Sequence, residues 1–227
     1  MIRYLVLILV FAIGINSICY SQKNNEEYSY SISLRTNLFS VLEVDGGIML
    51  GLRYQWSKRF AAVLDPTFIF FNLYDNTNST SNGQPIGIKI RSDLRYYLDK
   101  NTSRRNRYFI APEFHYKYVS TKRWANFGIN CIGQQCDYYM NAKYQQIKNE
   151  TGGTLKLGAE IPLSDKDKWA IEVYGGLGFK FKNFKQKDIP AGGIFLASPA
   201  SDDVFGFEEG TAIPVFPASI KISYRIR

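Results

Sequence analysis

The 227-residue chain is poor in cysteine and histidine, and these shortages argue against most metal-dependent and histidine-dependent chemistry. It contains three cysteines and a single histidine, His115. No further Cys or His stands near Cys131 and Cys136, so the pair lacks the companions of a structural zinc site. Any catalysis that needs a histidine rests on His115 alone. We therefore expect no metal site, no cofactor site and no catalytic residues.

Long apolar runs are also missing, apart from one at the N-terminus. Residues 5–15 are apolar and follow one basic residue, Arg3, a pattern that is typical of a secretory signal peptide and too short for a membrane helix. Cleavage is expected before Gln22, so residues 1–21 are the predicted signal peptide. Residues 22–27 are then a short periplasmic lead.

A lipoprotein signal is the competing interpretation of this N-terminus, with Cys19 as the lipidated residue. Bulky Ile18 stands where that signal requires a small residue, so the secretory signal is favoured. Beyond residue 21, no apolar run in the sequence is long enough for a helix across a membrane. Any membrane residence of the mature chain must therefore come from β-strands.

The clearest pattern is the strict alternation of residues 86–98. One set of alternate positions is almost wholly apolar and runs through Ile86, Ile88, Ile90, Ser92, Leu94, Tyr96 and Leu98. The other set carries Lys89, Arg91, Asp93 and Arg95. Soluble strands usually run about five or six residues, whereas a tilted strand needs about 9–11 to cross a bilayer. The segment predicts a transmembrane strand with lipid on one side and a polar lumen on the other.

Similar alternation recurs along residues 28–227, which we predict to be one all-β domain. The expected strands are residues 28–40, 48–56, 60–71, 86–98, 108–120, 143–163, 169–182 and 216–227. Short connections at 57–59, 99–107 and 164–168 contrast with long loops at 72–85, 121–142 and 183–215. This arrangement predicts an eight-stranded antiparallel up-and-down transmembrane β-barrel with a polar, side-chain-filled lumen.

Local signals refine this prediction. Asp45-Gly46-Gly47 reads as a turn, Asp65-Pro66 as a bulge or edge irregularity, and Gly152-Gly153 as a kink. Helices play no part. Cys131 and Cys136 lie in the loop 121–142, and in an exported chain they are expected to form a disulfide that stabilises by a few kcal/mol at most.

Charged residues occupy the positions that face the predicted lumen. An eight-stranded ring is just wide enough for side chains to fill it, and buried charges must pair. A structural plug of ion pairs is therefore favoured over an anion path. The predicted polar network consists of Arg53, Lys89, Arg91, Asp93, Arg95, Glu113, His115, Lys117, Lys156, Glu160, Glu172 and Lys180.

Aromatic residues gather where the predicted strands end at the periplasmic side. Such a girdle marks the membrane–water interface of outer-membrane barrels. The predicted girdle consists of Trp56, Tyr96, Tyr108, Trp169 and Tyr224.

The chain resembles the small eight-stranded outer-membrane barrels of the OmpA-transmembrane-domain, OmpX and OmpW kind. In detail it is most similar to uncharacterised Bacteroidota-type barrel proteins. The resemblance is carried by residues 33–38 (SLRTNL), 91–97 (RSDLRYY), 155–158 (LKLG) and 220–225 (IKISYR). It implies insertion into the bacterial outer membrane by the barrel-assembly machinery, contact with membrane lipid and lipopolysaccharide, and a monomer.

The expected function is structural or surface-binding, through the extracellular loops and an unidentified extracellular ligand, without catalysis. Three alternatives stay open: a small-solute channel, a lipid-modifying barrel enzyme and a secreted lipocalin-like barrel. The enzyme would require His115 to face lipid, but the alternation places it in the lumen. A formal net charge of +8 is compatible with nucleic-acid binding, but the basic residues are spread through strands and turns, so no nucleic-acid partner is expected.

Overall fold

The computed structural model describes residues 30–43, 45–72, 83–98, 106–133, 135–163, 168–196 and 210–226. The predicted signal peptide and periplasmic lead lie outside the described residues, as do residues 73–82, 99–105 and 197–209 within the predicted connections.

Ten strands and one short 3-10 helix make up the described chain, and their order is as follows. The elements are β1 (Ser31–Thr36), η1 (Leu38–Leu42), β2 (Asp45–Gln55), β3 (Phe60–Asn72), β4 (Ile86–Tyr97), β5 (Arg107–Ile129), β6 (Tyr138–Pro162), β7 (Trp169–Lys187), β8 (Gly193–Phe195), β9 (Ala212–Val215) and β10 (Ala218–Arg225).

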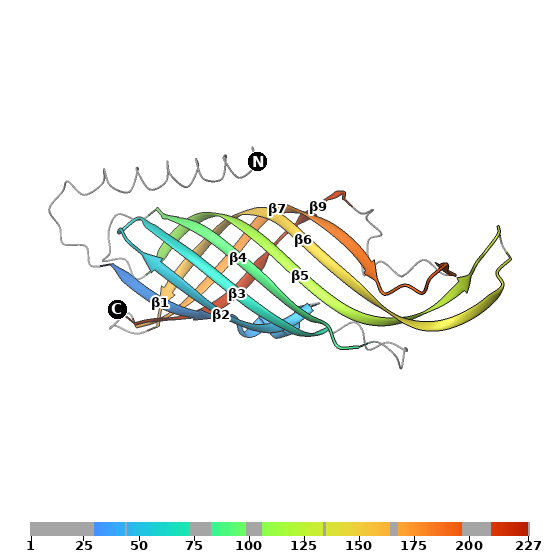
Figure 1. Cartoon of the computed structure of the whole chain (residues 1–227). Coiled ribbons are helices and arrows are strands. Elements are labelled where there is room, and N and C mark those ends of the chain that lie inside the picture. The colour runs from blue at the N-terminus through green and yellow to red at the C-terminus, as the bar shows by residue number, and fades with distance from the viewer. Residues whose placement is uncertain are drawn as a thin grey trace.

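Antiparallel pairing of neighbouring strands closes the sheet into a ring (Figure 1). Each strand from β1 to β7 pairs with the next, and β10 pairs with both β7 and β1. β9 pairs with the far part of β7, so β9 and β10 together form the eighth wall of the barrel. The predicted all-β, eight-stranded up-and-down barrel is confirmed.

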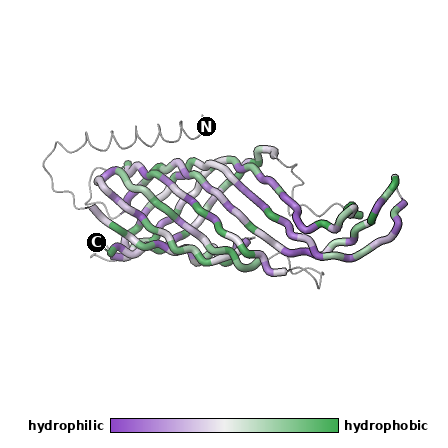
Figure 2. The backbone as a smooth tube through the Cα atoms, in the orientation of Figure 1, coloured by the Kyte–Doolittle hydropathy of each residue, from purple (hydrophilic) through white to green (hydrophobic). Residues whose placement is uncertain are grey.

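The two ends of the barrel differ. At one end, which we call the turn end, residues 56–59 connect β2 to β3 directly. At the other end, the arm end, β5 and β6 continue beyond the ring and η1 connects β1 to β2. Every second side chain of a strand faces the lumen, and Figure 2 shows the resulting alternation of hydrophilic and hydrophobic residues along the barrel.

The outer surface of the barrel is apolar and the lumen is charged. On β4, Leu94 is 60% exposed, whereas its neighbours Asp93 and Arg95 are 4% and 1% exposed. A lipocalin-like barrel needs the reverse arrangement, with the apolar face inside. In the described part of the chain, no helix has the length and apolarity needed to cross a membrane.

Several local predictions were wrong. η1 is a helical turn where none was expected, and its N-cap residue Asn37 accepts a hydrogen bond from the Phe39 amide. Residues 45–47 belong to β2, with a register shift between Gly46 and Gly47 in place of a free turn. Glycine fits here because a Cβ on Gly47 would lie 1.9 Å from the Phe68 carbonyl oxygen.

The irregularity expected at Asp65-Pro66 affects only one side of β3. Both residues pair with Arg91 and Ile90 on β4 without any shift of register, but the pairing of β3 with β2 passes from Thr67 to Leu64 and skips them. A proline has no backbone amide to donate, and it stands here where the pairing of β3 with β2 is interrupted. β6, where a kink was expected, keeps one register with β5 and β7 through Gly152.

The predicted loop 121–142 is mostly regular hairpin. β5 pairs with β4 only as far as Ser120, but continues against β6 to the pair Ile129–Tyr138. Nine further residues at about 3.3 Å each extend roughly 30 Å beyond the ring. Residues 121–144 with β8 form a projection that we call the arm (Figure 1).

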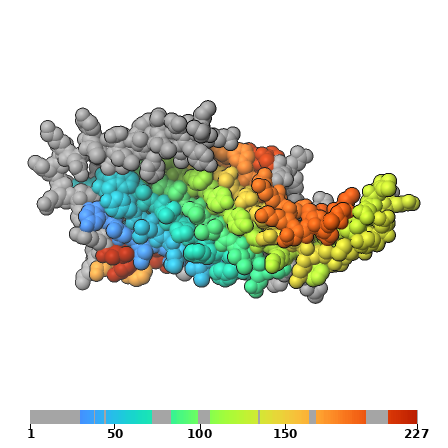
Figure 3. All heavy atoms as spheres, in the orientation of Figure 1, coloured from blue at the N-terminus to red at the C-terminus, as the bar shows by residue number. Residues whose placement is uncertain are grey.

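The arm has a small core of its own. Phe127, Ile129 and Tyr144 are buried, and Phe195 from β8 packs against them, with ring centroids 4.6 Å from Phe127 and 5.0 Å from Tyr144. β8 adds to the free edge of β5 through the pairs from Phe127–Phe195 to Ile129–Gly193. Figure 3 shows this orange segment lying along the yellow-green hairpin.

The tip of the arm is closed by the Cys131–Cys136 disulfide, as predicted. Asn130, with a φ of 49°, and Gly133, with a φ of 65°, adopt left-handed backbone conformations that turn the chain. The Asn130 side-chain amide also donates to Asp137 at 3.0 Å. Covalent and hydrogen-bonded closure therefore holds the exposed end of the arm in one shape.

Candidate functional site

The middle of the lumen is closed by buried ion pairs that link opposite walls. Glu172 on β7 accepts from Arg35 on β1 at 2.7 Å and from Arg95 on β4 at 2.6 Å. These three side chains are 0–1% exposed. One carboxylate on β7 therefore joins strands from two other parts of the ring.

Further pairs extend this network. Asp65 contacts Lys221 at 2.6 Å and Arg35 at 3.5 Å. Lys156 pairs with Glu113 and lies 3.4 Å from Asp93, which in turn accepts from Arg95 at 2.9 Å.

Towards the turn end, the network finishes at Glu160. Its carboxylate lies 2.6 Å from Arg53 and accepts from the Tyr97 hydroxyl at 3.1 Å. The guanidinium of Arg107 stacks over the Tyr97 ring, 3.9 Å from its centroid. The central cluster, as we define it, has five bases and five acids: Arg35, Arg53, Arg95, Lys156, Lys221, Asp65, Asp93, Glu113, Glu160 and Glu172. Because the charges balance and the side chains fill the space, this part of the lumen is a plug.

The lumen towards the arm end has a different composition. Strand pairing sets Lys182, Glu150, Lys117 and Lys89 side by side across β7, β6, β5 and β4. The neighbouring inward row contains Lys180, Gly152, His115 and Arg91. Cations thus outnumber the single carboxylate in these two rows.

Two carboxylates reach these rows from the segment after η1. Glu43 pairs with Lys89 and lies 3.6 Å from Arg91. Burial by itself raises the pKa of Glu43, but Arg91 and Lys89 outweigh burial and hold this pKa below its usual value. Asp45 contacts Lys117, and Lys148 at 2.9 Å.

The remaining carboxylate, Glu150, is shared by three lysines at longer distances. It lies 3.6 Å from Lys117, 3.6 Å from Lys148 and 3.5 Å from Lys180. The arm-end cluster consists of Lys89, Arg91, Lys117, Lys148, Lys180, Lys182, Glu43, Asp45 and Glu150. Among the residues that the structure describes, this cluster contains six bases and three acids, and solvent reaches Lys180, which is 24% exposed.

All twelve residues of the predicted polar network take inward positions in the strand alternation. Seven of them belong to the central cluster or its pairs: Arg53, Asp93, Arg95, Glu113, Lys156, Glu160 and Glu172. The other five line the arm end: Lys89, Arg91, His115, Lys117 and Lys180. The His115 ring lies over Gly152, where an added Cβ would come 2.5 Å from the ring.

Several lumen residues were missed by sequence reasoning. Arg35 and Asp65 complete the centre, and Glu43, Asp45, Lys148 and Glu150 belong to the arm end. Arg35 lies on the same buried face of β1 as Ser31 and Ser33, so the alternation along this strand could have identified it as a lumen residue.

The predicted aromatic girdle forms two contact chains at the turn end. Trp56 stacks on Phe60 at 6.4 Å, and Phe60 contacts Tyr96 at 5.3 Å. Trp169 lies 4.8 Å from Tyr224 across β7 and β10.

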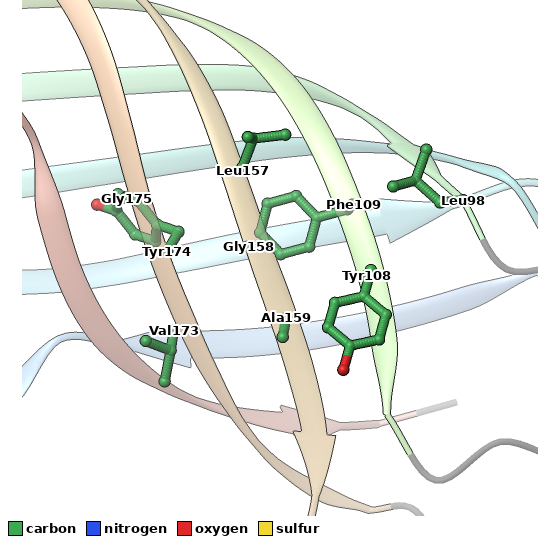
Figure 4. A pocket seen from close by; sticks show the side chains of 9 residues that line it. All are labelled: Leu98, Tyr108, Phe109, Leu157, Gly158, Ala159, Val173, Tyr174 and Gly175. Atoms are coloured by element: carbon green, nitrogen blue, oxygen red, sulfur yellow. The ribbon is translucent and has the colours of Figure 1, made fainter.

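Tyr108, the remaining girdle residue, borders a shallow apolar groove of about 390 Å³ on the outer wall. Figure 4 shows Leu98, Leu157 and Val173 around it, and Gly175 leaves open space between them. The groove opens outward into the apolar band, so its surroundings suit a hydrocarbon chain rather than a polar substrate.

No protein-family model matches this chain, and no curated protein matches it either. Among solved structures, the crystal structure of Acinetobacter baumannii CarO aligns with 88% of this chain and 99% of that chain, at 9% sequence identity and a TM-score of 0.37. A likeness at this level carries no functional argument, so the fold assignment rests on strand pairing and burial.

Proposed function

We propose that this protein is an outer-membrane β-barrel that acts at the cell surface through its arm, with a closed lumen and no catalysis. The observation that carries the proposal is the combination of a plugged, charge-balanced barrel with a rigid hairpin that extends roughly 30 Å beyond it. Because the lumen is closed, we expect binding at the projecting arm, since segments held out by a rigid scaffold commonly carry binding residues.

The outer surface supports membrane insertion. Outward apolar residues run along β4 from Tyr96 in the girdle to Ile86 near the arm end. Ten residues at about 3.3 Å, tilted by about 40°, give a band roughly 25 Å tall, the height of the apolar band of outer-membrane barrels. On β7 the outward series becomes polar after Phe181, at Asn183 and Lys185.

The arm offers surface suited to recognition. Tyr138 and Tyr139 on the hairpin are 54% and 61% exposed, Trp124 is 40% exposed, and Ile132 at the tip is 88% exposed. Aromatic side chains on a rigid support supply contact area at low entropic cost. The disulfide and the Phe127 core hold the arm in shape before any ligand arrives.

The same geometry weighs against the channel and enzyme alternatives. A solute would have to displace Glu172, Arg35 and Arg95, whose ion pairs span the lumen. His115 faces the lumen beside Arg91, away from the lipid on which a membrane enzyme acts. Membrane lipid, lipopolysaccharide and the assembly machinery are the expected partners of a monomeric barrel.

Heat-modifiability and surface labelling together test the proposal. We expect the mature chain in an outer-membrane fraction to migrate faster on a gel unheated than boiled. On intact cells, mild reduction should make Cys131 and Cys136 reactive to a membrane-impermeant maleimide. Extraction by carbonate without a mobility shift would contradict the barrel. Labelling only after lysis would contradict a surface arm.

The lumen proposal has a separate readout. In planar bilayers we expect no stepwise conductance from the wild-type barrel, because the central cluster fills its cross-section. Reproducible single-channel steps from the purified wild-type protein, absent from a mock purification, would support the channel instead.

A further inference from the structure

The outward face of the barrel changes from apolar to basic where the arm leaves the ring. On β7 the outward series passes from Phe179 and Phe181 through Asn183 to Lys185 and Lys187, and both lysines are exposed. Side chains at these alternate positions all stand on the outer surface of the strand. The two lysines therefore follow directly after the apolar surface of the barrel.

Two more lysines lie beside them at the base of the arm. Strand pairing sets Lys122 on β5, Gln145 on β6 and Lys187 on β7 in one outward row. Lys143 takes the next outward position along β6, and Lys122 and Lys143 are exposed. Neighbouring strands are about 4.8 Å apart, so the backbones that carry Lys122 and Lys187 are roughly 10 Å apart. Figure 1 shows β5, β6 and β7 side by side at this place.

A tryptophan stands within this basic patch, which consists of Lys122, Lys143, Lys185 and Lys187. Trp124 pairs with Lys143 across β5 and β6, and the Lys143 Nζ lies 5.1 Å from the centroid of the Trp124 ring. The ring is 40% exposed. Tryptophan is enriched at the boundary between membrane and water, where its apolar body contacts lipid and its indole N–H reaches polar groups. The combination of tryptophan and lysine is therefore typical of a membrane interface.

The height of the basic patch matches the headgroup layer of a membrane. Lys185 lies four residues after the outward Phe181, and Lys122 lies four residues after the outward Tyr118. Four residues at about 3.3 Å, on a strand tilted by about 40°, rise roughly 10 Å. The headgroup layer adds about 5–8 Å to each side of the hydrocarbon core, and a long lysine side chain can bend back towards it. The ammonium groups can thus reach the phosphates of lipid headgroups.

Given an outer-membrane barrel whose arm lies outside the cell, as proposed above, we propose that the basic patch binds the phosphate groups of a phosphorylated glycolipid of the outer leaflet. Lysine binds phosphate as a point charge, and each lysine near a membrane surface adds to the attraction towards anionic lipid. The patch is continuous with the apolar wall, so one lipid molecule can place its acyl chains beside Phe181 and a phosphate between Lys122 and Lys187. A dissolved phosphate would make only the second contact, so lipid is the occupant that fits this surface.

Calorimetric titration of the folded, full mature barrel in detergent micelles tests the proposal, with lipid A and with the same lipid A after removal of its phosphates. The variant Lys122→Gln/Lys187→Gln removes the two cations that flank Gln145. The matched control, Lys58→Gln/Lys168→Gln, removes two lysines at the turn end, on the other side of the apolar band. At low ionic strength we expect similar affinity of wild type and control for lipid A, and an affinity lower by roughly tenfold or more for the patch variant. Dephosphorylated lipid A should bind all three proteins equally weakly.

Three results would overturn the basic patch as a lipid phosphate site. Equal affinity of the wild type for lipid A with and without phosphates would mean that acyl contacts alone carry the binding. Equal weakening in both variants would indicate general charge attraction. Full competition by inorganic phosphate at the concentration of the lipid would indicate a site for dissolved phosphate.

Gel mobility of the same samples separates this inference from the proposed function. Undetectable lipid A binding by a wild type that migrates faster unheated than boiled would overturn the basic patch but leave the barrel intact. A wild type without this mobility shift would contradict the barrel itself. Faster unheated migration of the patch variant shows that its weaker binding is not lost folding.

Discussion

The lumen contains two charged regions that are built from the same residue types but differ in burial and in the distances between their charged groups. In the central cluster, each acid has close partners and the side chains are almost fully buried, as at Glu172. In the arm-end cluster, Lys117 and Lys148 contact Asp45, whereas Glu150 lies 3.5–3.6 Å from Lys117, Lys148 and Lys180, and solvent reaches Lys180. The central cluster closes the lumen, whereas solvent enters the lumen at the arm-end cluster.

The comparison indicates that the burial of an ion pair, more than the number of ion pairs, determines how much the pair affects the free energy of unfolding. A buried pair gains little over apolar packing but becomes costly when one partner is lost. A partly hydrated pair adds little to the free energy of unfolding, so removing one of its partners costs little. We therefore expect substitutions at the centre to lower the free energy of unfolding more than substitutions at the arm end.

The largest effect is expected for Glu172→Gln. The substitution keeps the shape but leaves Arg35 and Arg95 without the carboxylate that joins them, at a cost of about 3–5 kcal/mol. Urea unfolding of the barrel in lipid vesicles, followed by gel mobility, measures this loss. An unchanged midpoint would mean that the central cluster is not a cooperative plug.

A smaller effect is expected when both partners of one central pair are removed together. Lys156→Met alone leaves Glu113 buried and unpaired, and we expect a loss of about 3 kcal/mol. Adding Glu113→Gln should recover about 1–2 kcal/mol of that loss, since no charge is then stranded. A double-mutant cycle in urea measures the coupling, and additive losses would contradict a direct pair.

At the arm end, Asp45→Asn should destabilise less than either central change. Asp45 holds Lys117 and Lys148, but both lysines keep Glu150 as a partner. We expect a loss of about 1–2 kcal/mol, between the buried and the exposed limits. The same urea assay, run beside Glu172→Gln, checks the order. A loss as large as that of Glu172→Gln would erase the distinction between the two regions.

The sequence predicted the ring and much of its lumen because an apolar outer surface and a charged lumen impose strict alternation on the strands. β4 shows this in full, and its four charged residues all face inward. Asp65 was missed since the adjacent Pro66 suggests an irregular strand, although the proline faces out and leaves the register with β4 intact. Glu43 was missed because it follows a 3-10 turn, where alternation gives no direction.

The arm and the ion-pair partners could not be derived from the pattern. Both faces of the hairpin beyond Ser120 meet water or a very small core, so Lys122, Trp124 and Asn126 do not alternate by polarity as membrane strands do. Which acid meets which base depends on strand stagger and tilt around the ring, and these are fixed by register rather than by composition. Arg35 and Glu172, 137 positions apart, illustrate the point.

The smallest effect on stability is expected for Lys180→Gln, and it sharpens the comparison most. Lys180 is 24% exposed and shares Glu150 with Lys117 and Lys148, so its removal leaves that carboxylate paired and reduces repulsion among neighbouring cations. We expect a change within about 0.5 kcal/mol in urea unfolding, screened further by salt. Lys221→Gln is the matched variant at the centre, where the lost cation leaves Asp65 with only the 3.5 Å contact from Arg35. If the two lysine variants lose equal stability, the ion pairs of the arm end are as important for stability as those of the centre.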